Sequence, residues 1–288
     1  MEGTGASPNG RVAILAGGGV LPPILAAAAA ALGRAPVVFA ISGEADPTLF
    51  GPLRVEVVRW GELGRLFRLL DECDCREAAL IGAVARRPDF RAILPDLGAV
   101  KLLPRIVQLL RAGDDSVLKG VAALFEEQGV KLVSPLDLAP DLALPEGVLT
   151  GAMPRDAMQD IDKALEAARL IGGLDIGQAA VAVGGRVVAV EDAGGTDGLL
   201  DRVAMLRAGG KIGFKGGVLV KCMKPNQDPR LDLPTIGPVT AAAALRAGLD
   251  GVAGEAGRSL LAGRDETVEA FARAGLFLLG LKEPGLGQ

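Results

Sequence analysis

The sequence predicts an α/β fold in two parts, because short apolar strands alternate with helical stretches along most of the chain. Residues 12–16 read as a buried strand, residues 17–19 as a glycine turn, and Pro22 lies near the first position of the helix that follows. Residues 36–41 form the next apolar run. Strands that alternate with helices indicate a parallel sheet covered on both faces.

The same alternation continues through the first half of the chain. Further strands are expected at residues 55–60, 78–84 and 131–133, and helices at 63–70, 102–110 and 117–127. Residues 1–134 are therefore expected to form a Rossmann-like domain with a parallel sheet. Residues 135–150 are rich in Pro, Leu and Asp without a clear period, so they read as a linker.

Residues 151–288 are expected to form a second, C-terminal α/β domain that carries the catalytic site. A helix is expected at 156–170, followed by a hairpin of strands 178–183 and 186–191 around Gly184 and Gly185. Later strands are expected at 218–223, 249–254 and 276–281, and later helices at 198–207, 241–247 and 267–274.

Composition excludes several classes of function. The chain has 288 residues, a net charge of −4 and only 3 % aromatic residues, which argues against a nucleic-acid binder. It contains no histidine, so it cannot form a Ser-His-Asp triad, a Cys-His pair or an HExxH zinc site. The three cysteines include a CxC pair at Cys73 and Cys75, which completes no zinc knuckle and favours reduced thiols.

The apolar segment at residues 12–32 could be mistaken for a signal peptide. Three glycines and the Pro22-Pro23 pair interrupt it, and the uninterrupted apolar stretch is too short to span a bilayer. We therefore expect a cytoplasmic protein.

A loop at residues 221–237, with the sequence KCMKPNQDPRLDLPTIG, holds cations and carboxylates close together. Its three prolines and final glycine prevent it from extending either neighbouring element. Such a loop suits recognition of an anion beside a metal or a general base. A solvated surface loop would explain the same composition.

Two other turns allow a functional and a structural interpretation. The triplet Gly17, Gly18 and Gly19 could hold a phosphate with its N–H groups, or it could simply form a tight turn. A dinucleotide GxGxxG motif would require glycine at position 22, where Pro22 stands. In the acidic run at 191–197, Thr196 or Asp197 could cap the next helix or could belong to a site.

Seven short motifs occur in an order that resembles a known family. They are LAGGG (15–19), RRPDF (86–90), GDD (113–115), DIDKAL (160–165), VEDAGGTD (190–197), the loop at 221–237 and GVAGEAGRSLL (251–261). Together they resemble the UDP-2,3-diacylglucosamine pyrophosphatase family of lipid A biosynthesis, from about residue 11 to residue 281.

This resemblance implies hydrolysis to UMP and 2,3-diacylglucosamine 1-phosphate, with dependence on Mg²⁺ or another divalent cation. The family's essential aspartate belongs to the DLPTIG motif, which assigns the catalytic role to Asp232. Candidate metal ligands are Asp232, Glu191 and Asp197. Candidate substrate contacts are Gly17, Gly18, Gly19, Gly82, Thr196, Lys221, Lys224, Gln227, Arg230 and Thr235.

Two other classes stay open at this point: a non-hydrolytic nucleotide-binding module and a nucleotide-dependent oxidoreductase. The oxidoreductase would require an acidic residue after the second strand, where only Glu44 is available. The expected partners are the lipid nucleotide, its product and, transiently, the inner face of a membrane through Phe90 and the arginines around it. An ordinary loop would explain residues 86–90 equally well. The sequence does not indicate an oligomeric state.

Overall fold

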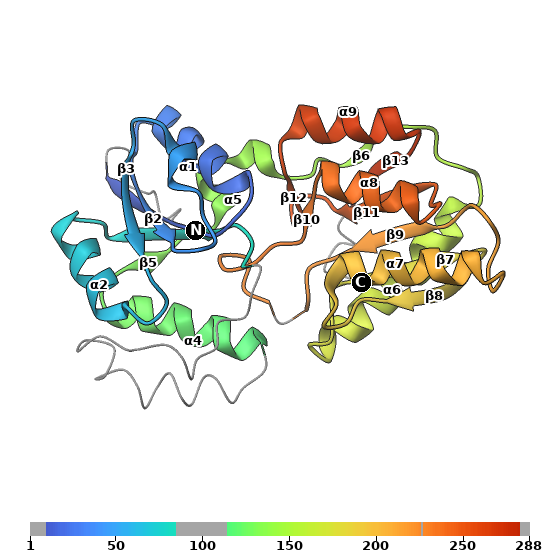
Figure 1. The fold of residues 1–288 in the computed structure, drawn as a ribbon, viewed down its shortest axis with the longest axis horizontal. Coiled ribbons are helices and arrows are strands. Elements are labelled where there is room, and N and C mark those ends of the chain that lie inside the picture. Colours follow the sequence, from blue (N-terminus) through green and yellow to red (C-terminus); the bar gives the residue numbers. More distant parts are fainter. Residues whose placement is uncertain (1–9, 85–113, 226, 283–288) are drawn as a thin grey trace. The chain divides into compact units, whose positions relative to one another are not determined.

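The computed structural model describes residues 10–84, 114–225 and 227–282 (Figure 1). The chain divides into two compact units. The first is Met1–Pro140 together with Arg230–Asp232, and the second is Asp141–Pro229 together with Leu233–Gln288. The division therefore falls inside the range expected for the linker.

The first unit has a five-stranded parallel sheet. Its strand order is β3-β2-β1-β4-β5. The strands are β1 (Arg11–Ala16), β2 (Ala35–Ile41), β3 (Arg54–Val58), β4 (Glu77–Ile81) and β5 (Lys131–Leu132). This is the Rossmann order, in which the chain reverses direction across the sheet between β1 and β4. The Rossmann-like prediction is confirmed.

Helices and an aromatic pair complete the core of this unit. Phe67 and Phe125 meet edge to face, with ring centroids 5.1 Å apart. Leu231 is 7 % exposed and belongs to the same apolar cluster. The helical elements are α1 (Leu21–Ala31), η1 (Pro47–Phe50), α2 (Leu63–Glu72), α4 (Asp114–Glu127) and α5 (Pro135–Leu138), followed by η2 (Pro140–Leu142).

The second unit has a six-stranded mixed sheet in the order β6-β13-β11-β9-β7-β8. Its strands are β6 (Gly147–Thr150), β7 (Ala179–Val183), β8 (Arg186–Val190), β9 (Val218–Lys221), β11 (Gly251–Glu255) and β13 (Phe277–Leu281). Strands β9, β11 and β13 are parallel, whereas β6 and β7 run antiparallel to them. A separate pair, β10 (Thr235–Ile236) and β12 (Leu260–Leu261), is also parallel.

Helices cover both faces of this sheet. Successive side chains of a strand point to opposite faces, and those of β9 pack against different helices on the two sides. Leu219 lies in the apolar cluster with α7 (Gly195–Ala208), α8 (Pro238–Arg246) and α9 (Arg264–Ala274). Its neighbours Val218 and Val220 lie in the cluster with α6 (Ala157–Gly173). The second α/β domain is confirmed.

The structure also contains elements that the sequence analysis did not identify. Residues 135–150, expected as a linker, contain α5, η2 and β6, and β6 pairs with the edge of the second sheet. The strands β10 and β12 have only two residues each and were too short to show a period. The helix expected at 102–110 lies outside the described residues. No helix in the described ranges is both long and apolar enough to cross a membrane.

The turns after β1 and β4 are joined by backbone hydrogen bonds. The N–H of Gly17 donates to the carbonyl of Ile81 at 2.9 Å, and that of Gly18 donates to the carbonyl of Ala83 at 2.7 Å. Gly82 has φ +101°, and a Cβ at this position would lie 2.8 Å from atoms of Gly17 and Gly18. This close approach requires glycine at position 82.

We expect Gly82→Ala to lower the free energy of unfolding by about 3 kcal/mol, because it combines a steric clash with an unfavourable φ. The matched control is Gly43→Ala. Gly43 has φ +85°, but a Cβ there would meet none of the described atoms within 4 Å. This control should cost only about 1 kcal/mol. Denaturant unfolding measures both values, and equal losses would contradict the close approach.

Candidate active site

The candidate active site lies at one edge of the second sheet. Strands β9 and β11 end there, with Lys221 and Glu255 as their last residues. Strand β8 is antiparallel to β7, which is antiparallel to β9, so β8 also ends at this edge and Glu191 follows it. We call this side the carboxyl edge. Loops at the carboxyl ends of strands are where open α/β sheets bind ligands.

Glu255 connects three elements at the carboxyl edge. Its side chain is buried, and Oε1 accepts a hydrogen bond from Nη2 of Arg169 in α6 at 2.8 Å. Oε2 accepts the backbone N–H of Met223 at 3.0 Å, just after β9. A buried carboxylate that binds a cation and an N–H group keeps its charge compensated. Glu255 therefore fixes the beginning of the loop at 221–237.

Glu191 is the second buried carboxylate at this edge. Its Oε2 accepts the backbone N–H of Gln178 at 2.8 Å, and its Oε1 accepts the hydroxyl of Thr196 at 2.8 Å. Both oxygens are thus used within the fold, and they orient Thr196 at the start of α7. Asp197 is exposed in the first turn of α7, where a negative charge suits the helix dipole.

The loop at 221–237 brings four predicted substrate contacts into one unit. Lys221 is 7 % exposed, and its Nζ donates to the carbonyl of Thr235 at 3.0 Å. Gln227 is also buried, and its Oε1 accepts the N–H of Lys224 at 3.1 Å. The Nζ of Lys224 pairs with Oδ1 of Asp175 at 2.5 Å. These buried polar contacts distinguish the loop from a solvated surface segment.

Arg230 and Asp232 belong to the first unit. Nη1 of Arg230 pairs with Oε1 of Glu126 at 3.0 Å, on α4. Asp232 is exposed, whereas its neighbours Leu231 and Leu233 are buried. The two leucines thus anchor the backbone and leave the carboxylate of Asp232 at the surface.

The described residues include no group of three Cys, Asp or Glu side chains placed to hold a metal ion. Asp232 lies in the first unit, and Glu191 and Asp197 lie in the second. A site made entirely of protein carboxylates is therefore not formed within either described unit. Mg²⁺ usually takes only one or two protein carboxylates and completes its shell with phosphate oxygens and water. An exposed carboxylate such as Asp232 fits that smaller requirement.

The glycine turn of the first unit has limited capacity to bind an anion in this conformation. The N–H groups of Gly17 and Gly18 are used by the turn after β4, as described above. Gly19 is exposed with φ +94°. A Cβ at Gly17 would lie 2.6 Å from the carbonyl oxygen of Ala83, so Gly17, like Gly82, has a structural role. The contacts of both glycines with substrate stay a prediction.

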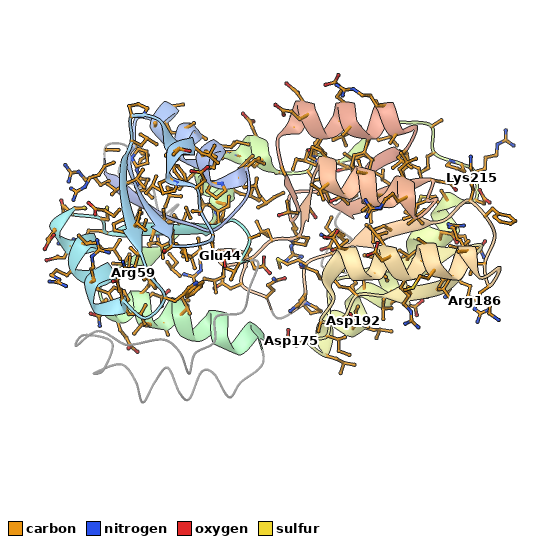
Figure 2. The ribbon with its side chains drawn as sticks, in the orientation of Figure 1. Glu44, Arg59, Asp175, Arg186, Asp192 and Lys215 are labelled. Carbon is orange, nitrogen blue, oxygen red and sulfur yellow. The ribbon has the colours of Figure 1, made fainter. Side chains whose placement is uncertain are left out.

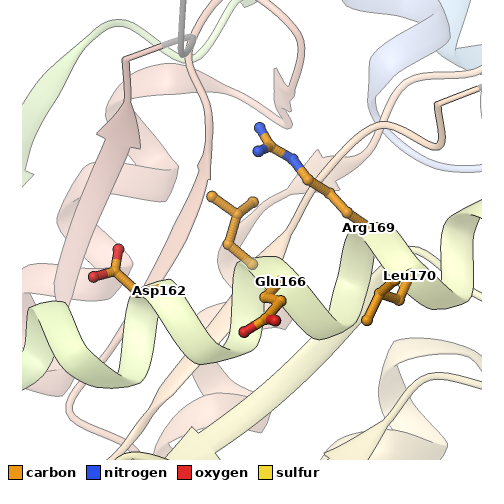
Figure 3. A pocket seen from close by; sticks show the side chains of 5 residues that line it. Asp162, Glu166, Arg169 and Leu170 are labelled. Carbon is orange, nitrogen blue, oxygen red and sulfur yellow. The ribbon is translucent and has the colours of Figure 1, made fainter.

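A shallow depression of about 400 Å³ runs along α6 in the second unit (Figure 3). It is lined by Asp162, Leu165, Glu166, Arg169 and Leu170. Figure 3 shows the guanidinium of Arg169 extending from the helix on the side opposite the carboxylate of Glu166. The depression contains none of the predicted site residues, but Arg169 connects it to Glu255.

Three residues of this site were not identified from the sequence: Glu255, Arg169 and Asp175. Glu255 follows a predicted strand within the GVAGEAG motif, so its position at a carboxyl end was an available signal. Arg169 and Asp175 act on residues 86 and 49 positions away in the chain. No local sequence pattern predicts contacts between residues so far apart in the chain.

Comparison with known proteins extends over both units. Residues 11–142 match the model of the LpxI N-terminal domain, and residues 145–279 match that of the LpxI C-terminal domain. The chain belongs to the LpxI family. It is 42 % identical to the UDP-2,3-diacylglucosamine pyrophosphatase LpxI of Caulobacter vibrioides over 274 residues. That alignment covers 94 % of this chain and 97 % of the relative. The resemblance inferred from the motifs is confirmed.

The three cysteines should be unreactive in the folded protein. All three are buried, and burial raises the pKa of Cys222 to about 12 and that of Cys75 to about 11. A raised pKa keeps the thiol protonated at pH 8, and the protonated thiol is a poor nucleophile. We expect maleimide to label no thiol in the native protein and all three after unfolding in guanidinium chloride. Rapid native labelling of Cys222 would contradict its burial at the carboxyl edge.

Proposed function

We propose that this protein hydrolyses the pyrophosphate bond of UDP-2,3-diacylglucosamine, giving UMP and 2,3-diacylglucosamine 1-phosphate. The observation that carries the proposal is the 42 % identity to a UDP-2,3-diacylglucosamine pyrophosphatase along nearly the whole of both chains. The absence of histidine agrees with it, because a His-ligated dinuclear phosphoesterase site cannot form. The same match favours hydrolysis over a nucleotide-binding module or an oxidoreductase.

The residues of the carboxyl edge suit the recognition of a pyrophosphate. Negative charge accumulates on the leaving phosphate during cleavage, so cationic and N–H donors must compensate it. Lys221 and Lys224 provide ammonium groups at this edge, and Thr196 provides a hydroxyl at the N-terminal end of α7. The helix N-terminus adds a partial positive charge. Gln227 and Thr235 support the two lysines through the loop's hydrogen bonds.

Asp232 is the proposed catalytic carboxylate. It is exposed between two buried leucines, so it can accept a proton from an attacking water or bind a cation. Mg²⁺ is the proposed cofactor, with Asp232 as its proposed ligand, and the assignment of Asp197 as a ligand stays a prediction from the sequence. When bound, it would supply positive charge to the phosphate oxygens. Glu191 retains its role in orienting Thr196.

We further propose that the protein works at the cytoplasmic face of a membrane as a peripheral enzyme. The substrate and product each carry two acyl chains, so exchange with the bilayer must occur at or near its surface. The net charge of −4 gives no general attraction to anionic lipids, which favours an apolar contact. Phe90 and the arginines on either side of it are the candidate, and they lie outside the described residues.

Replacement of the carboxylate in Asp232→Ala should reduce the rate of hydrolysis by about a thousandfold or more, because it removes a group that acts in the transition state. The melting temperature should change little, since the side chain is exposed. Release of UMP in the presence of Mg²⁺ measures the rate, and EDTA should suppress it in the wild type.

The control for this variant is Asp201→Ala, which removes an exposed carboxylate from α7. It should retain full activity. An Asp232→Ala protein that keeps more than about a tenth of the wild-type rate would remove Asp232 from the mechanism.

Binding to liposomes tests the proposed membrane contact. Wild-type protein should sediment with vesicles that contain the substrate lipid, and Phe90→Asp should sediment several-fold less, because it places a charge where an apolar side chain is expected. Phe214→Asp is the control, since Phe214 is 88 % exposed in the second unit and is not assigned to the contact. Equal sedimentation of wild type and Phe90→Asp would rule out this loop.

A further inference from the structure

Two residues other than glycine have a left-handed backbone among those described. They are Asp74, with φ 51°, and Asp175, with φ 56°. A left-handed backbone costs free energy for any residue with a Cβ. Where a helix ends with a left-handed residue, that residue is usually glycine. Each aspartate directly follows the C-cap of a helix, Cys73 for α2 and Leu174 for α6.

Both helices end in the same hydrogen-bond pattern. After α6, the N–H of Asp175 donates to the carbonyl of Gly172 at 3.1 Å, and the next N–H donates to Ile171 at 3.0 Å. After α2, the N–H of Asp74 donates to Asp71 at 2.9 Å, and the next N–H donates to Leu70 at 2.9 Å. These are Schellman motifs in which aspartate replaces glycine. The two sites are therefore closely matched in backbone geometry.

The side chains of the two aspartates differ in their surroundings. The side chain of Asp74 is 79 % exposed, and it pairs with Arg76, itself 59 % exposed, at 3.3 Å. The side chain of Asp175 is 26 % exposed, and it pairs at 2.5 Å with Lys224, which is only 12 % exposed. Water screens the exposed pair between Asp74 and Arg76 and makes it weak. The pair between Asp175 and Lys224 is less exposed, so it is screened less and is stronger.

The contact between Asp175 and Lys224 occurs where α6 meets the loop at 221–237. A Cβ added at Gly172 would lie 3.4 Å from Cα of Lys224 and 3.3 Å from Cδ of Pro225, so the helix end lies close against the loop. The backbone N–H of Lys224 is held by Gln227. Figure 2 shows Asp175 and Asp192 at one edge of the second unit, opposite Arg186 and Lys215. Asp192 follows Glu191, so Asp175 lies at the carboxyl edge.

We propose that Asp175 is a positioning residue, which holds the ammonium group of Lys224 in place for the phosphates of the substrate. This inference rests on the proposed hydrolysis. A lysine has a long flexible stem, and fixing it before the substrate arrives removes an entropic cost from binding. Glycine would relieve the backbone strain at position 175, but it could not provide the carboxylate. The strained backbone at position 175 therefore has a functional reason, which is the carboxylate that pairs with Lys224.

The test compares Asp175→Gly with Asp74→Gly, which changes the matched site at the end of α2 in the first unit. Because it exchanges backbone strain for a more flexible unfolded chain, Asp74→Gly should keep its melting temperature within about 3 °C of the wild type. Asp175→Gly also loses the partly buried ion pair with Lys224, so it should melt somewhat lower while it stays folded at the assay temperature. Asp175→Gly should lower kcat/KM for UDP-2,3-diacylglucosamine by about tenfold. Asp74→Gly should leave kcat/KM unchanged.

Two further variants separate positioning from a structural effect. Asp175→Asn tolerates the left-handed backbone and can still accept a hydrogen bond, so it should recover part of the lost activity. Lys224→Ala should lower kcat/KM at least as much as Asp175→Gly, and the double variant should be no worse than Lys224→Ala alone, because both act through one group.

Full activity of Asp175→Gly, or losses that multiply in the double variant, would overturn the assignment of Asp175. If the wild type itself left the substrate intact, the proposed hydrolysis would fail and this inference with it. Activity of the wild type therefore distinguishes the two failures.

Discussion

Buried carboxylates hold the loops of the candidate site against the sheet edge from which they emerge. Glu255 binds the N–H of Met223 and the guanidinium of Arg169, and Glu191 binds the N–H of Gln178 and the hydroxyl of Thr196. A charge that is removed from water requires compensation by partners of this kind. Both carboxylates depend in turn on the strand order, which brings the ends of β8, β9 and β11 to one edge.

This arrangement separates residues that organise the site from those available to a substrate. Glu191 was a candidate metal ligand, yet its two oxygens are engaged within the second unit. Asp232 differs in exposure, since its carboxylate reaches the surface between two buried leucines. In a site of this kind, folding fixes the polar groups that hold the loops, and a small number of side chains take part in the reaction. This suits a reaction that depends on the position of the substrate and on compensation of its charge.

The sequence predicted the α/β class and most elements, because apolar strands and helical stretches differ clearly in period and length. It did not predict β10 and β12, since two residues are too few to show a period, and Pro-rich residues 135–150 concealed β6. The common loop predicted Lys221, Lys224, Gln227 and Thr235 as substrate contacts, and those contacts stay a prediction. Asp175, the partner of Lys224, and Arg169, the partner of Glu255, were not predicted, because side-chain pairing over such distances in the chain leaves no local pattern.

Hydrogen exchange with and without the two products tests most directly whether the carboxyl edge binds the substrate. Binding should slow exchange of backbone amides in residues 221–237 and at the start of α7, because those amides become ordered or covered. Exchange in residues 209–217, which precede β9 at the opposite edge, should not change. Protection confined to residues 209–217, with none in 221–237, would contradict the assignment of the site.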